Sequence, residues 1–424
     1  HDTGQTVGSV VQIGDPITQK MMFDFLLEAR DLGLYSAITD NGAGGLSSSV
    51  GEMAEGPGGA WIDLARAPLK YAGLNPWEIL LSEAQERMTL AVPGACLDAF
   101  LDLARRREVE ATDLGAFTDD GYLECRYGDR VVALLPLDFL HDGLPEMRLE
   151  AAWSPPEARA AASLGPPASP EEGTARLEAL LARDNVASDE ALCRRYDHEV
   201  KGLTVIKPWV GAHRDVPSDA TVLQVDHAGF EGYALAEGIF PTYSDFDAQA
   251  MADAAVDLAV RRLVAAGASP RRIAALDNFC WPDPMPGPAN PDAEHKLAQL
   301  VRACEGLARS CEAHGVPLIS GKDSMKNDAV VGGERISVPP TLLVSAIGLV
   351  EDVREAMTLE PLAPGETLIQ VGETHDELGG SEWAALQGDR GGHVPRCDPR
   401  EWSARYRAVA DVVREGLVTA VHAP

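Results

Sequence analysis

The fold of this chain is decided by one stretch of sequence, Thr39-Asp40-Asn41-Gly42-Ala43-Gly44-Gly45-Leu46-Ser47-Ser48-Ser49. A β-prone run from Tyr35 leads into it, and the residues from Leu46 to Ala54 have the pattern of a helix. An acid, Asp40, therefore ends a strand, and three glycines fill the turn before a helix. Glycines let a ligand approach the backbone, and a helix N-terminus offers N–H groups to an anion. The stretch predicts either a cradle for phosphate and Mg²⁺ or an ordinary strand–turn–helix connection capped by Asp40 and the serines.

Composition restricts the classes of protein to consider. The chain has 424 residues, 45% of them hydrophobic, which predicts two or three domains with substantial cores. Its formal net charge of −30 argues against nonspecific binding to nucleic acid or to an anionic membrane. The seven cysteines are scattered without a Cys-x-x-Cys pair, and no apolar run approaches the ~18 residues of a membrane span. We therefore expect a cytoplasmic protein without a disulfide framework or a zinc site.

Strand-like and helix-like segments alternate along the chain, which predicts an α/β fold. A hairpin is expected across Gly128-Asp129, and a strand from Thr367 to Val371. The predicted units are, in order, an α/β lobe at 1–150, a Pro/Ala-rich connector with helices at 151–195, a second α/β lobe at 196–350 and the incomplete start of another lobe at 351–424.

Acid-bearing segments follow two predicted strands of the second lobe. A strand from Ile273 to Leu276 is expected to end at Asp277, and one from Val316 to Ser320 to run into Gly321-Lys322-Asp323-Ser324. These last four residues offer a close backbone, a cation, a carboxylate and a hydroxyl, which suits a metal-nucleotide or a plain turn. Their spacing is not that of a Walker A motif.

Other polar residues leave two interpretations open. Asp253 and Asp257 lie four residues apart and share one face of the helix predicted for Asp247–Ala266. A cation would relieve their repulsion, but on an acidic protein the pair also suits a solvated face. Asp219 by itself is typical of a turn. The polar residues before another predicted strand suit either substrate groups or a charged strand entry: Glu83, Gln85 and Glu86.

Four motifs, in this order, resemble those of a known family. They are Gln12-Ile13-Gly14-Asp15-Pro16, Thr39 to Leu46, Ser82-Glu83-Ala84-Gln85-Glu86-Arg87-Met88 and Ile319-Ser320-Gly321-Lys322-Asp323-Ser324-Met325. The family is the synthetase component of phosphoribosylformylglycinamidine synthases, which act in purine biosynthesis. The resemblance runs almost from end to end of the chain.

The resemblance implies a fold and a reaction. The fold is a duplicated pair of α/β lobes like those of aminoimidazole ribonucleotide synthetase (PurM-like), with mixed sheets packed with helices. Residues 1–150 then form the C-terminal-type lobe of a first half, 196–350 the nucleotide-binding lobe of a second half, and 351–424 the start of its C-terminal-type lobe. In the reaction, ATP activates the amide oxygen of formylglycinamide ribonucleotide. Ammonia drawn from glutamine by a glutaminase domain or subunit then displaces phosphate to give the amidine.

The resemblance also assigns roles to individual residues. Substrate-contacting positions correspond to Gln12, Glu83, Ala84, Gln85 and Ser324. ATP-contacting positions correspond to Asp277, Gly321 and Lys322. Ligands of Mg²⁺ correspond to Asp40 and, in the nucleotide site of large-type members, to Asp219, Asp253, Asp257 and Asp323.

Three positions depart from the family pattern or divide its subtypes. Asp257 stands where the large-type members have Asn. Ala84 replaces the usual Ser between Glu and Gln, so any contact from that hydroxyl is lost. Lys322-Asp323 follows the large-type pattern, whereas small-type members have Asn and an apolar residue there.

Parts of the family pattern are missing from the sequence. No motif for its catalytic histidines or its ATP-contacting lysine precedes Gln12, and neither a complete last lobe nor a glutaminase is present. The resemblance therefore predicts a central fragment that holds no catalytic residue and is inactive alone. Two other interpretations stay open: a sibling ATP-dependent synthetase of the same fold, and a non-catalytic nucleotide-binding scaffold that docks a glutaminase.

Overall fold

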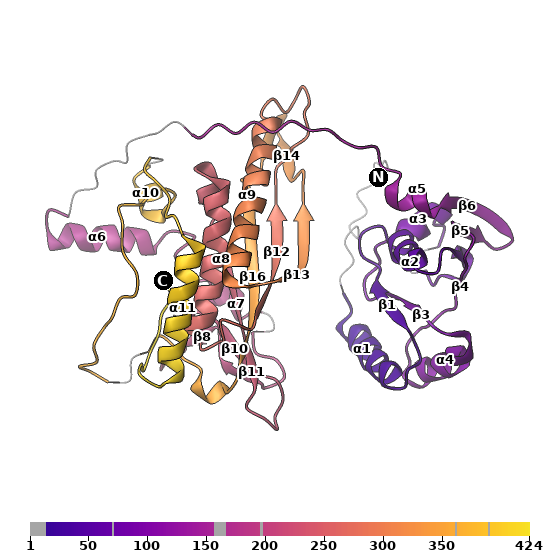
Figure 1. Cartoon of the computed structure of the whole chain (residues 1–424), viewed down its shortest axis with the longest axis horizontal. Coiled ribbons are helices and arrows are strands. Elements are labelled where there is room, and N and C mark those ends of the chain that lie inside the picture. The colour runs from indigo at the N-terminus through magenta and orange to yellow at the C-terminus, as the bar shows by residue number, and fades with distance from the viewer. Residues whose placement is uncertain (1–13, 70–71, 157–166, 196–197, 361–362, 389–390) are drawn as a thin grey trace. The chain divides into compact units, whose positions relative to one another are not determined.

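The computed structural model describes residues 14–69, 72–156, 167–195, 198–360, 363–388 and 391–424. The chain divides into two compact units, His1–Met147 (unit 1) and Arg148–Pro424 (unit 2). Each unit carries strands and helices, as Figure 1 shows, and each is described by itself. Within the described residues, no helix combines the length and the apolar character needed to cross a membrane.

Unit 1 contains two small sheets with helices around them. β1 pairs antiparallel with β3, and the other sheet has the order β4-β2-β5-β6. The predicted hairpin across Gly128-Asp129 is confirmed, because β5 and β6 pair antiparallel on either side of it. The elements are α1 (Pro16–Asp31), β1 (Ala37–Asp40), α2 (Leu46–Glu55), β2 (Ala60–Asp63), η1 (Leu64–Arg66), α3 (Pro76–Leu81), β3 (Met88–Ala91), η2 (Gly94–Cys96), α4 (Leu97–Arg106), β4 (Gly115–Phe117), β5 (Tyr122–Tyr127), β6 (Arg130–Pro136) and α5 (Leu137–Asp142).

Two apolar clusters hold unit 1 together. One joins the buried face of α2, including Leu46 and Val50, to Ile62 of β2 and Leu123 of β5. The other joins α1 to α4, where the rings of Phe25 and Phe100 meet edge to face at 5.0 Å. Because α2 packs on the larger sheet, its N-terminus is held in place at the end of β1.

Unit 2 is built on one six-stranded sheet of order β13-β12-β16-β11-β10-β7. Its pairings are antiparallel except for β12 with β13, so the predicted mixed sheet is confirmed. Long helices α8, α9 and α11 pack together beside this sheet (Figure 1). The elements are α6 (Pro170–Leu181), α7 (Glu190–Cys193), β7 (Thr204–Ile206), β8 (Trp209–Val210), β9 (Val216–Pro217), β10 (Thr221–Gln224), β11 (Gly232–Ile239), η3 (Pro241–Asp245), α8 (Ala248–Ala265), β12 (Ile273–Cys280), α9 (Ala293–His314), β13 (Leu318–Ser324), β14 (Asp328–Val331), β15 (Glu334–Ser337), β16 (Thr341–Val350), η4 (Val353–Glu355), α10 (Glu382–Leu386) and α11 (Pro399–Arg414).

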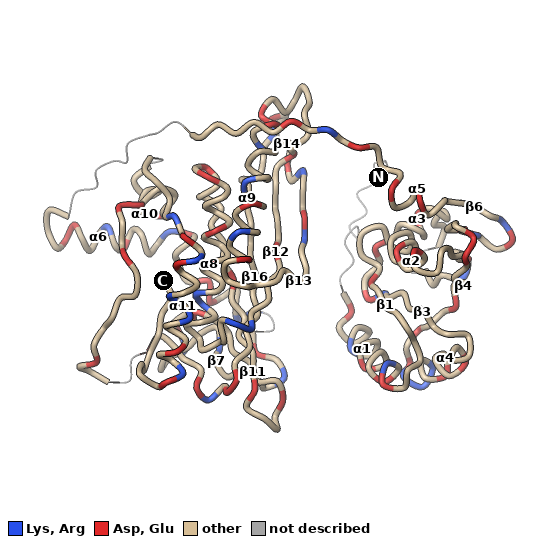
Figure 2. Tube along the Cα trace, in the orientation of Figure 1, with Lys and Arg blue, Asp and Glu red and all other residues tan. Residues whose placement is uncertain are grey.

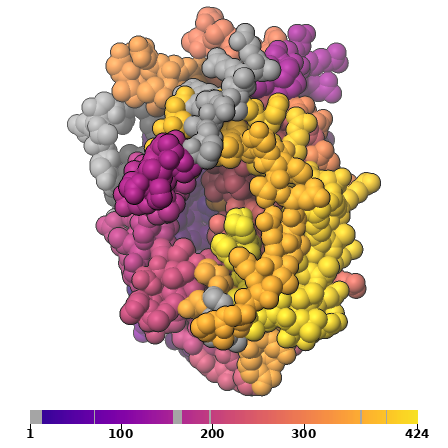
Figure 3. All heavy atoms as spheres, turned by 90° about the vertical axis from the view of Figure 1, so that its left-hand side faces the viewer, coloured from indigo at the N-terminus to yellow at the C-terminus, as the bar shows by residue number. Residues whose placement is uncertain are grey.

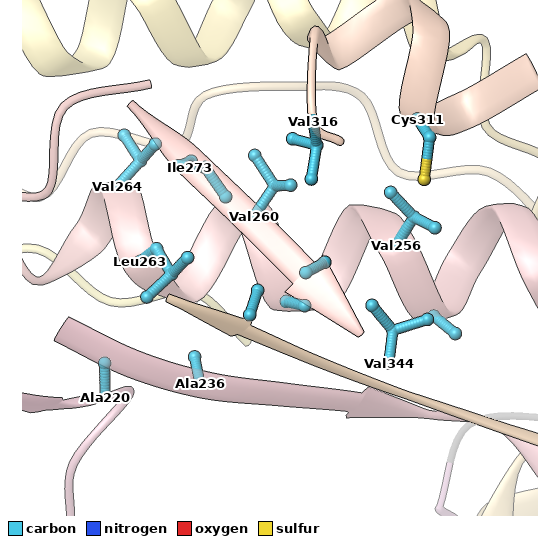
Figure 4. Close-up of a cluster of buried hydrophobic side chains, with 14 of the residues drawn as sticks. Ala220, Ala236, Val256, Val260, Leu263, Val264, Ile273, Cys311, Val316 and Val344 are labelled. Atoms are coloured by element: carbon cyan, nitrogen blue, oxygen red, sulfur yellow. The ribbon is translucent and has the colours of Figure 1, made fainter. Parts of the chain in front are cut away.

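The alanine-rich helix α8 is the centre of the unit 2 core. It is buried on nearly all sides, as expected of a helix enclosed by a sheet and two other helices. Figure 4 shows Val256 and Val260 of α8 between two sets of side chains. On one side lies Val344 of the sheet, and on the other lie Cys311 of α9 and Val316, which follows α9. Small side chains on α8 let it approach the sheet closely.

Three predicted elements of unit 2 differ from the structure. The strands do not end before their acid-bearing segments: β12 continues through Asp277 to Cys280, and β13 through Gly321 to Ser324. The reason is that these residues pair with each other in parallel, which local sequence patterns cannot show. The strand predicted from Thr367 to Val371 is wrong, since these exposed residues have no strand partner in the part of the chain described.

Gly238 tests how tightly α8 packs on β11. A Cβ atom at this position would lie 2.0 Å from the carbonyl oxygen of Ala255 in α8. We expect Gly238→Ala to lower the free energy of unfolding by about 2 kcal/mol, because the helix must shift to make room. Chemical denaturation measures the change. In the matched control Gly287→Ala the new methyl group meets no atom within 4 Å, so stability should be unchanged. Equal stability of both variants would contradict the packing described.

Candidate functional site

The glycine turn after β1 and the loop between α3 and β3 come together in unit 1. β1 and β3 pair so that Asp40 lies opposite Met88. Gly45, the residue before α2, has φ 56, and a Cβ atom on it would lie 2.3 Å from the carbonyl oxygen of Ser82. Only glycine fits there without displacing the loop that begins at Ser82. The N-terminus of α2 therefore lies against the loop that carries Glu83 to Arg87.

The start of α1 is held by the same loop. Glu86, whose φ is 52, accepts a hydrogen bond through Oε1 from the backbone N–H of Asp15 at 3.0 Å. Three of the four sequence motifs thus meet in unit 1. Gln12, the predicted substrate-contacting residue of the first motif, lies outside the described residues.

Asp40 lies at the end of β1, as the sequence predicts. Its Oδ1 accepts a hydrogen bond from the N–H of Gly42 at 2.8 Å, and the residue is exposed. The neighbouring loop exposes Glu83 and Gln85, with Ala84 half-buried between them. A single exposed carboxylate fits Mg²⁺ that is otherwise held by water and substrate oxygens. The structure thus brings together Asp40 and the loop of Glu83, Ala84 and Gln85.

In unit 2 the parallel pair β12 and β13 places Asp277 opposite Gly321. Asp277, Gly321 and Asp323 share one face of the pair because side chains alternate along strands. A Cβ atom on Gly321 would lie 2.8 Å from Oδ1 of Asp277, so the carboxylate leans over the glycine. Burial and the nearby charge of Asp323 raise the pKa of Asp277. A cation bound here would relieve that repulsion.

Lys322 and Ser324 lie on the opposite face of the same strand, paired with Asn278 and Cys280. The structure therefore does not place them beside Asp277 and Asp323. Their predicted contacts with ATP and substrate remain predictions.

The two acids of α8 are bound by protein groups. Asp253, 4% exposed, accepts a hydrogen bond from Ser310 Oγ at 2.6 Å and forms an ion pair with Arg309, both on α9. Asp257, 5% exposed, accepts a hydrogen bond from the hydroxyl of Tyr406 on α11 at 2.5 Å. Burial raises the pKa of both carboxyl groups. These acids therefore link α8 to α9 and to α11. They do not form the solvated acidic face that was one interpretation of their spacing.

Asp219 is also engaged. Nδ1 of His422 lies 3.0 Å from its Oδ1, and the N–H of Ala423 donates to the same oxygen at 3.3 Å. Across the described ranges, no group of three or more His, Cys, Asp or Glu side chains is placed to hold a metal. Asp219, Asp253, Asp257 and Asp323 therefore do not fit a shared Mg²⁺ site as arranged here.

A pocket of about 600 Å³ opens beside Asp257. It lies between α8 and the segment that leads into α11, on the hollowed face where the C-terminal residues appear in yellow (Figure 3). Arg261 and Arg262 line it, and the Nε atom of each is buried without a hydrogen-bond partner. Cys397 also lines it, and burial raises the pKa of its thiol to about 12.

Acidic and basic residues are interspersed along both units, as Figure 2 shows.

Sequence reasoning missed the residues that engage the predicted acids. Arg309, Tyr406 and His422 are 56, 149 and 203 positions away from their partners along the chain. No local spacing signals such contacts, because they arise only when α9, α11 and the C-terminal segment pack on α8 and β10.

Family models match two parts of the chain. Residues 1–128 match the model described as "AIR synthase related protein, C-terminal domain", and residues 217–350 match "AIR synthase related protein, N-terminal domain". Together they cover more than half of the chain. The C-terminal type precedes the N-terminal type, as expected where the end of one lobe pair is followed by the start of another.

Curated relatives are similar over almost the whole chain. Phosphoribosylformylglycinamidine synthase subunit PurL of Methanopyrus kandleri is 36% identical over 97% of this chain and 54% of its own length. The subunit of the same name from Thermomicrobium roseum is 34% identical over 99% of this chain and 55% of its own. The chain spans about half the length of the curated relatives it matches.

Solved structures of a similar protein show the same fold. Thermotoga maritima PurL complexed with AMPPCP aligns with a TM-score of 0.60 and 26% identity, over 82% of this chain and 53% of that one. Its complex with ATP aligns with the same TM-score and identity, over 83% and 53%. Its complex with FGAR aligns with a TM-score of 0.62 and 22% identity, over 95% and 56%, which supports the fold alone.

Asp257 gives a pH-dependent prediction. Because burial raises its pKa above the ordinary 3.8, the folded chain holds this proton more tightly than the unfolded chain does. The contribution of Asp257 to stability is therefore greatest below pH 3.8. It declines as the pH rises from there through the raised pKa of the folded chain. Asp257→Asn removes the charge and keeps an oxygen for Tyr406. We expect the variant to be more stable than the wild type at pH 7, by about 1.4 kcal/mol for each unit of the shift.

Urea unfolding between pH 4 and pH 8 measures this difference, which should shrink as pH falls towards 4. The control Asp411→Asn changes an exposed acid of α11 that pairs only with Arg414 among its described neighbours, so its effect should be small at every pH. A less stable Asp257→Asn at pH 7 would show that Arg261, 3.7 Å from Asp257, outweighs the cost of burial.

Proposed function

Because this chain belongs to the family of AIR synthase related proteins, we propose that it is part of a phosphoribosylformylglycinamidine synthase. The proposed reaction converts formylglycinamide ribonucleotide, ATP and ammonia into formylglycinamidine ribonucleotide, ADP and phosphate. One observation carries the proposal furthest: three motifs that are separate in sequence meet at the N-terminus of α2 in unit 1. Such a meeting of glycine turn, acid and exposed polar loop suits a phosphorylated substrate.

The chemistry explains the need for ATP. An amide carbonyl is a poor electrophile, and transfer of the γ-phosphoryl group to its oxygen creates a leaving group. Ammonia then attacks the carbon, and the C–O bond breaks to release phosphate. When bound, Mg²⁺ would neutralise phosphoryl oxygens during the transfer.

The residues of this chain would bind and orient the reactants. In unit 1, Asp40 would hold Mg²⁺, and the loop of Glu83 and Gln85 would contact the ribonucleotide. In unit 2, Asp277 and Asp323 would face the metal-bound phosphates of ATP beside Gly321, whose missing side chain leaves room for the carboxylate of Asp277. Acid–base groups for the reaction are expected in the half of such enzymes that this chain does not match.

Two further assignments rest on the same family. We propose a glutaminase domain or subunit as the source of ammonia, and the cytoplasm as the location. All seven cysteines are free thiols, which suits a reducing compartment.

A second candidate function is a nucleotide-binding scaffold that docks a glutaminase. The observation in its favour is the internal bonding of Asp253 and Asp257, which makes the α8 region structural. Turnover separates the two candidates. In the longest polypeptide that contains this sequence, phosphate release should require formylglycinamide ribonucleotide, ammonia and ATP together. Nucleotide binding without such release would favour the scaffold.

Asp40→Asn tests the proposed metal ligand. The amide keeps the acceptor for the N–H of Gly42 but binds Mg²⁺ poorly, since hard cations prefer carboxylates. We expect the Mg²⁺-dependent affinity for formylglycinamide ribonucleotide to fall about tenfold or more, while the free energy of unfolding stays unchanged. Isothermal titration with and without Mg²⁺ measures this. Asp102→Asn, an exposed acid of α4 paired with Arg105, is the control and should bind normally. Full affinity in Asp40→Asn would remove this residue from the site.

Gly321→Ala tests the proposed ATP contact. The new methyl group would lie 2.8 Å from Oδ1 of Asp277 and would fill the space over which the carboxylate leans. We expect the affinity for Mg²⁺-ATP to fall about tenfold, which corresponds to the loss of one good charged contact. Gly287→Ala, in open surroundings, is the control. Equal affinities, measured by titration calorimetry, would place ATP elsewhere.

A further inference from the structure

Among the described residues of unit 1, two buried hydrogen-bond donors lack a partner. They are Nδ2 of Asn41 and Nε of Arg87, and neither residue is among the predicted site residues. Asn41 is 5% exposed, so its amide is shut off from bulk water. A buried N–H without an acceptor costs about 1–3 kcal/mol, and native structures rarely keep one without a reason.

The other end of the Asn41 amide is hydrogen-bonded within unit 1. Its Oδ1 accepts hydrogen bonds from Ser49 Oγ of α2 at 2.8 Å and from Thr89 Oγ1 of β3 at 3.1 Å. One donor thus comes from α2 and the other from β3. Nδ2, on the other branch of the amide, is directed away from both.

Arg87 lies beside Asn41 at that end. The N–H of Asn41 donates to the carbonyl oxygen of Arg87 at 3.3 Å, which continues the pairing of Asp40 with Met88 by one residue. Residues opposite each other in such a ribbon place their side chains on the same face. Nη2 of Arg87 donates to the carbonyl oxygen of Ser82, the atom that lies against Gly45 at the start of α2. The guanidinium group is thus held at the N-terminus of this ten-residue helix.

The electrostatics of this end of the ribbon favour an anion. α2 has no acidic residue in its first turn, so its free N–H groups add to the charge of Arg87. Burial lowers the pKa of Arg87, which shows the cost of holding this cation without an anion beside it. Two acids of the neighbouring segments accept from backbone N–H groups, Asp40 from Gly42 and Glu86 from Asp15. In a chain of net charge −30, a desolvated cation at a helix N-terminus requires an explanation.

We propose that Asn41, Arg87 and the N-terminus of α2 form a subsite for the phosphate group of a ribose 5-phosphate. Identification of the ligand rests on the proposed function, whereas the two unpaired donors do not. The turn from Gly42 to Gly45 carries no side chain larger than a methyl group, so phosphate oxygens can approach its backbone. The N–H groups of Gly42 and Gly45 donate to Asp40 and to the carbonyl oxygen of Gly42, so those of Ala43 and Gly44 would face the phosphate. Nδ2 of Asn41 and Nε of Arg87 supply the two donors that fix the phosphate in position.

Two substitutions test the subsite in the chain as it stands. Asn41→Asp keeps the oxygen that accepts from Ser49 and Thr89 but replaces the Nδ2 donor with a repelling oxygen. Arg87→Gln keeps a donor for Ser82 but removes the charge. Arg107→Gln is the matched control, because Arg107 is a half-exposed cation of unit 1 that pairs with Glu28.

Titration calorimetry with inorganic phosphate and with ribose 5-phosphate measures binding. Affinity should fall at least tenfold in Asn41→Asp and in Arg87→Gln and should stay unchanged in Arg107→Gln. Equal affinity in all four proteins would overturn the subsite and assign the donors to buried water.

A measurement on the wild-type chain covers the case in which a variant does not fold. The side-chain amide resonance of Asn41, followed by NMR, should shift on addition of phosphate and not on addition of chloride. An unmoved resonance at saturating phosphate would overturn the subsite.

The failure of the subsite and of the proposed function give different results. If ribose 5-phosphate binds to the wild-type chain and this binding is lost in Asn41→Asp, the subsite stands. If formylglycinamide ribonucleotide then binds no tighter than ribose 5-phosphate, the proposed substrate is wrong although the subsite is right. If formylglycinamide ribonucleotide binds tightly and equally to wild type and Asn41→Asp, the subsite is wrong and the proposed substrate stands.

Discussion

The close contact between Gly45 and the carbonyl oxygen of Ser82 is the constraint on which the candidate site of unit 1 depends. It leaves no room for a side chain at Gly45 and holds the loop of Glu83 to Arg87 against the N-terminus of α2. The same loop holds the start of α1 through Glu86. One backbone contact thus joins the glycine turn and the helix that follows it to a polar loop that is far away in the sequence.

Unit 2 uses glycine for the same physical purpose. Gly238 lets α8 lie against β11, and Gly321 leaves space for the carboxylate of Asp277 on the next strand. In the first case close packing fixes the position of α8, and with it that of Asp253 and Asp257. In the second case the missing side chain leaves room for the carboxylate of Asp277, which is repelled by that of Asp323. Glycine therefore allows close packing at Gly238 and leaves room for a neighbouring carboxylate at Gly321.

Charge is arranged differently in the two units. In unit 2 the acids of α8 are bound within the protein, Asp253 by an ion pair with Arg309 and a hydrogen bond from Ser310, and Asp257 by a hydrogen bond from Tyr406 with Arg261 nearby. These contacts join three helices and leave little of either carboxylate for a metal. In unit 1 the opposite holds, because the half-buried cation of Arg87 forms no ion pair with an acid among the described residues. A net charge of −30 therefore says little about the sign of the field at one site.

The sequence by itself determined the α/β class, the glycine turn after Asp40, the hairpin at Gly128-Asp129 and the order of the family motifs. These features depend on local periodicity and on residues near one another in the chain, which a sequence displays directly. It also singled out the segments of Asp277 and Gly321, which the structure pairs with each other, although it placed them in turns when they lie within strands. Only the tertiary structure decided that β12 and β13 pair in parallel, that Lys322 and Ser324 face away from Asp323, and which groups bind Asp219, Asp253 and Asp257. The unpaired donors of Asn41 and Arg87 are likewise visible only in the tertiary structure. A donor can be called unpaired only when its neighbours in space are known.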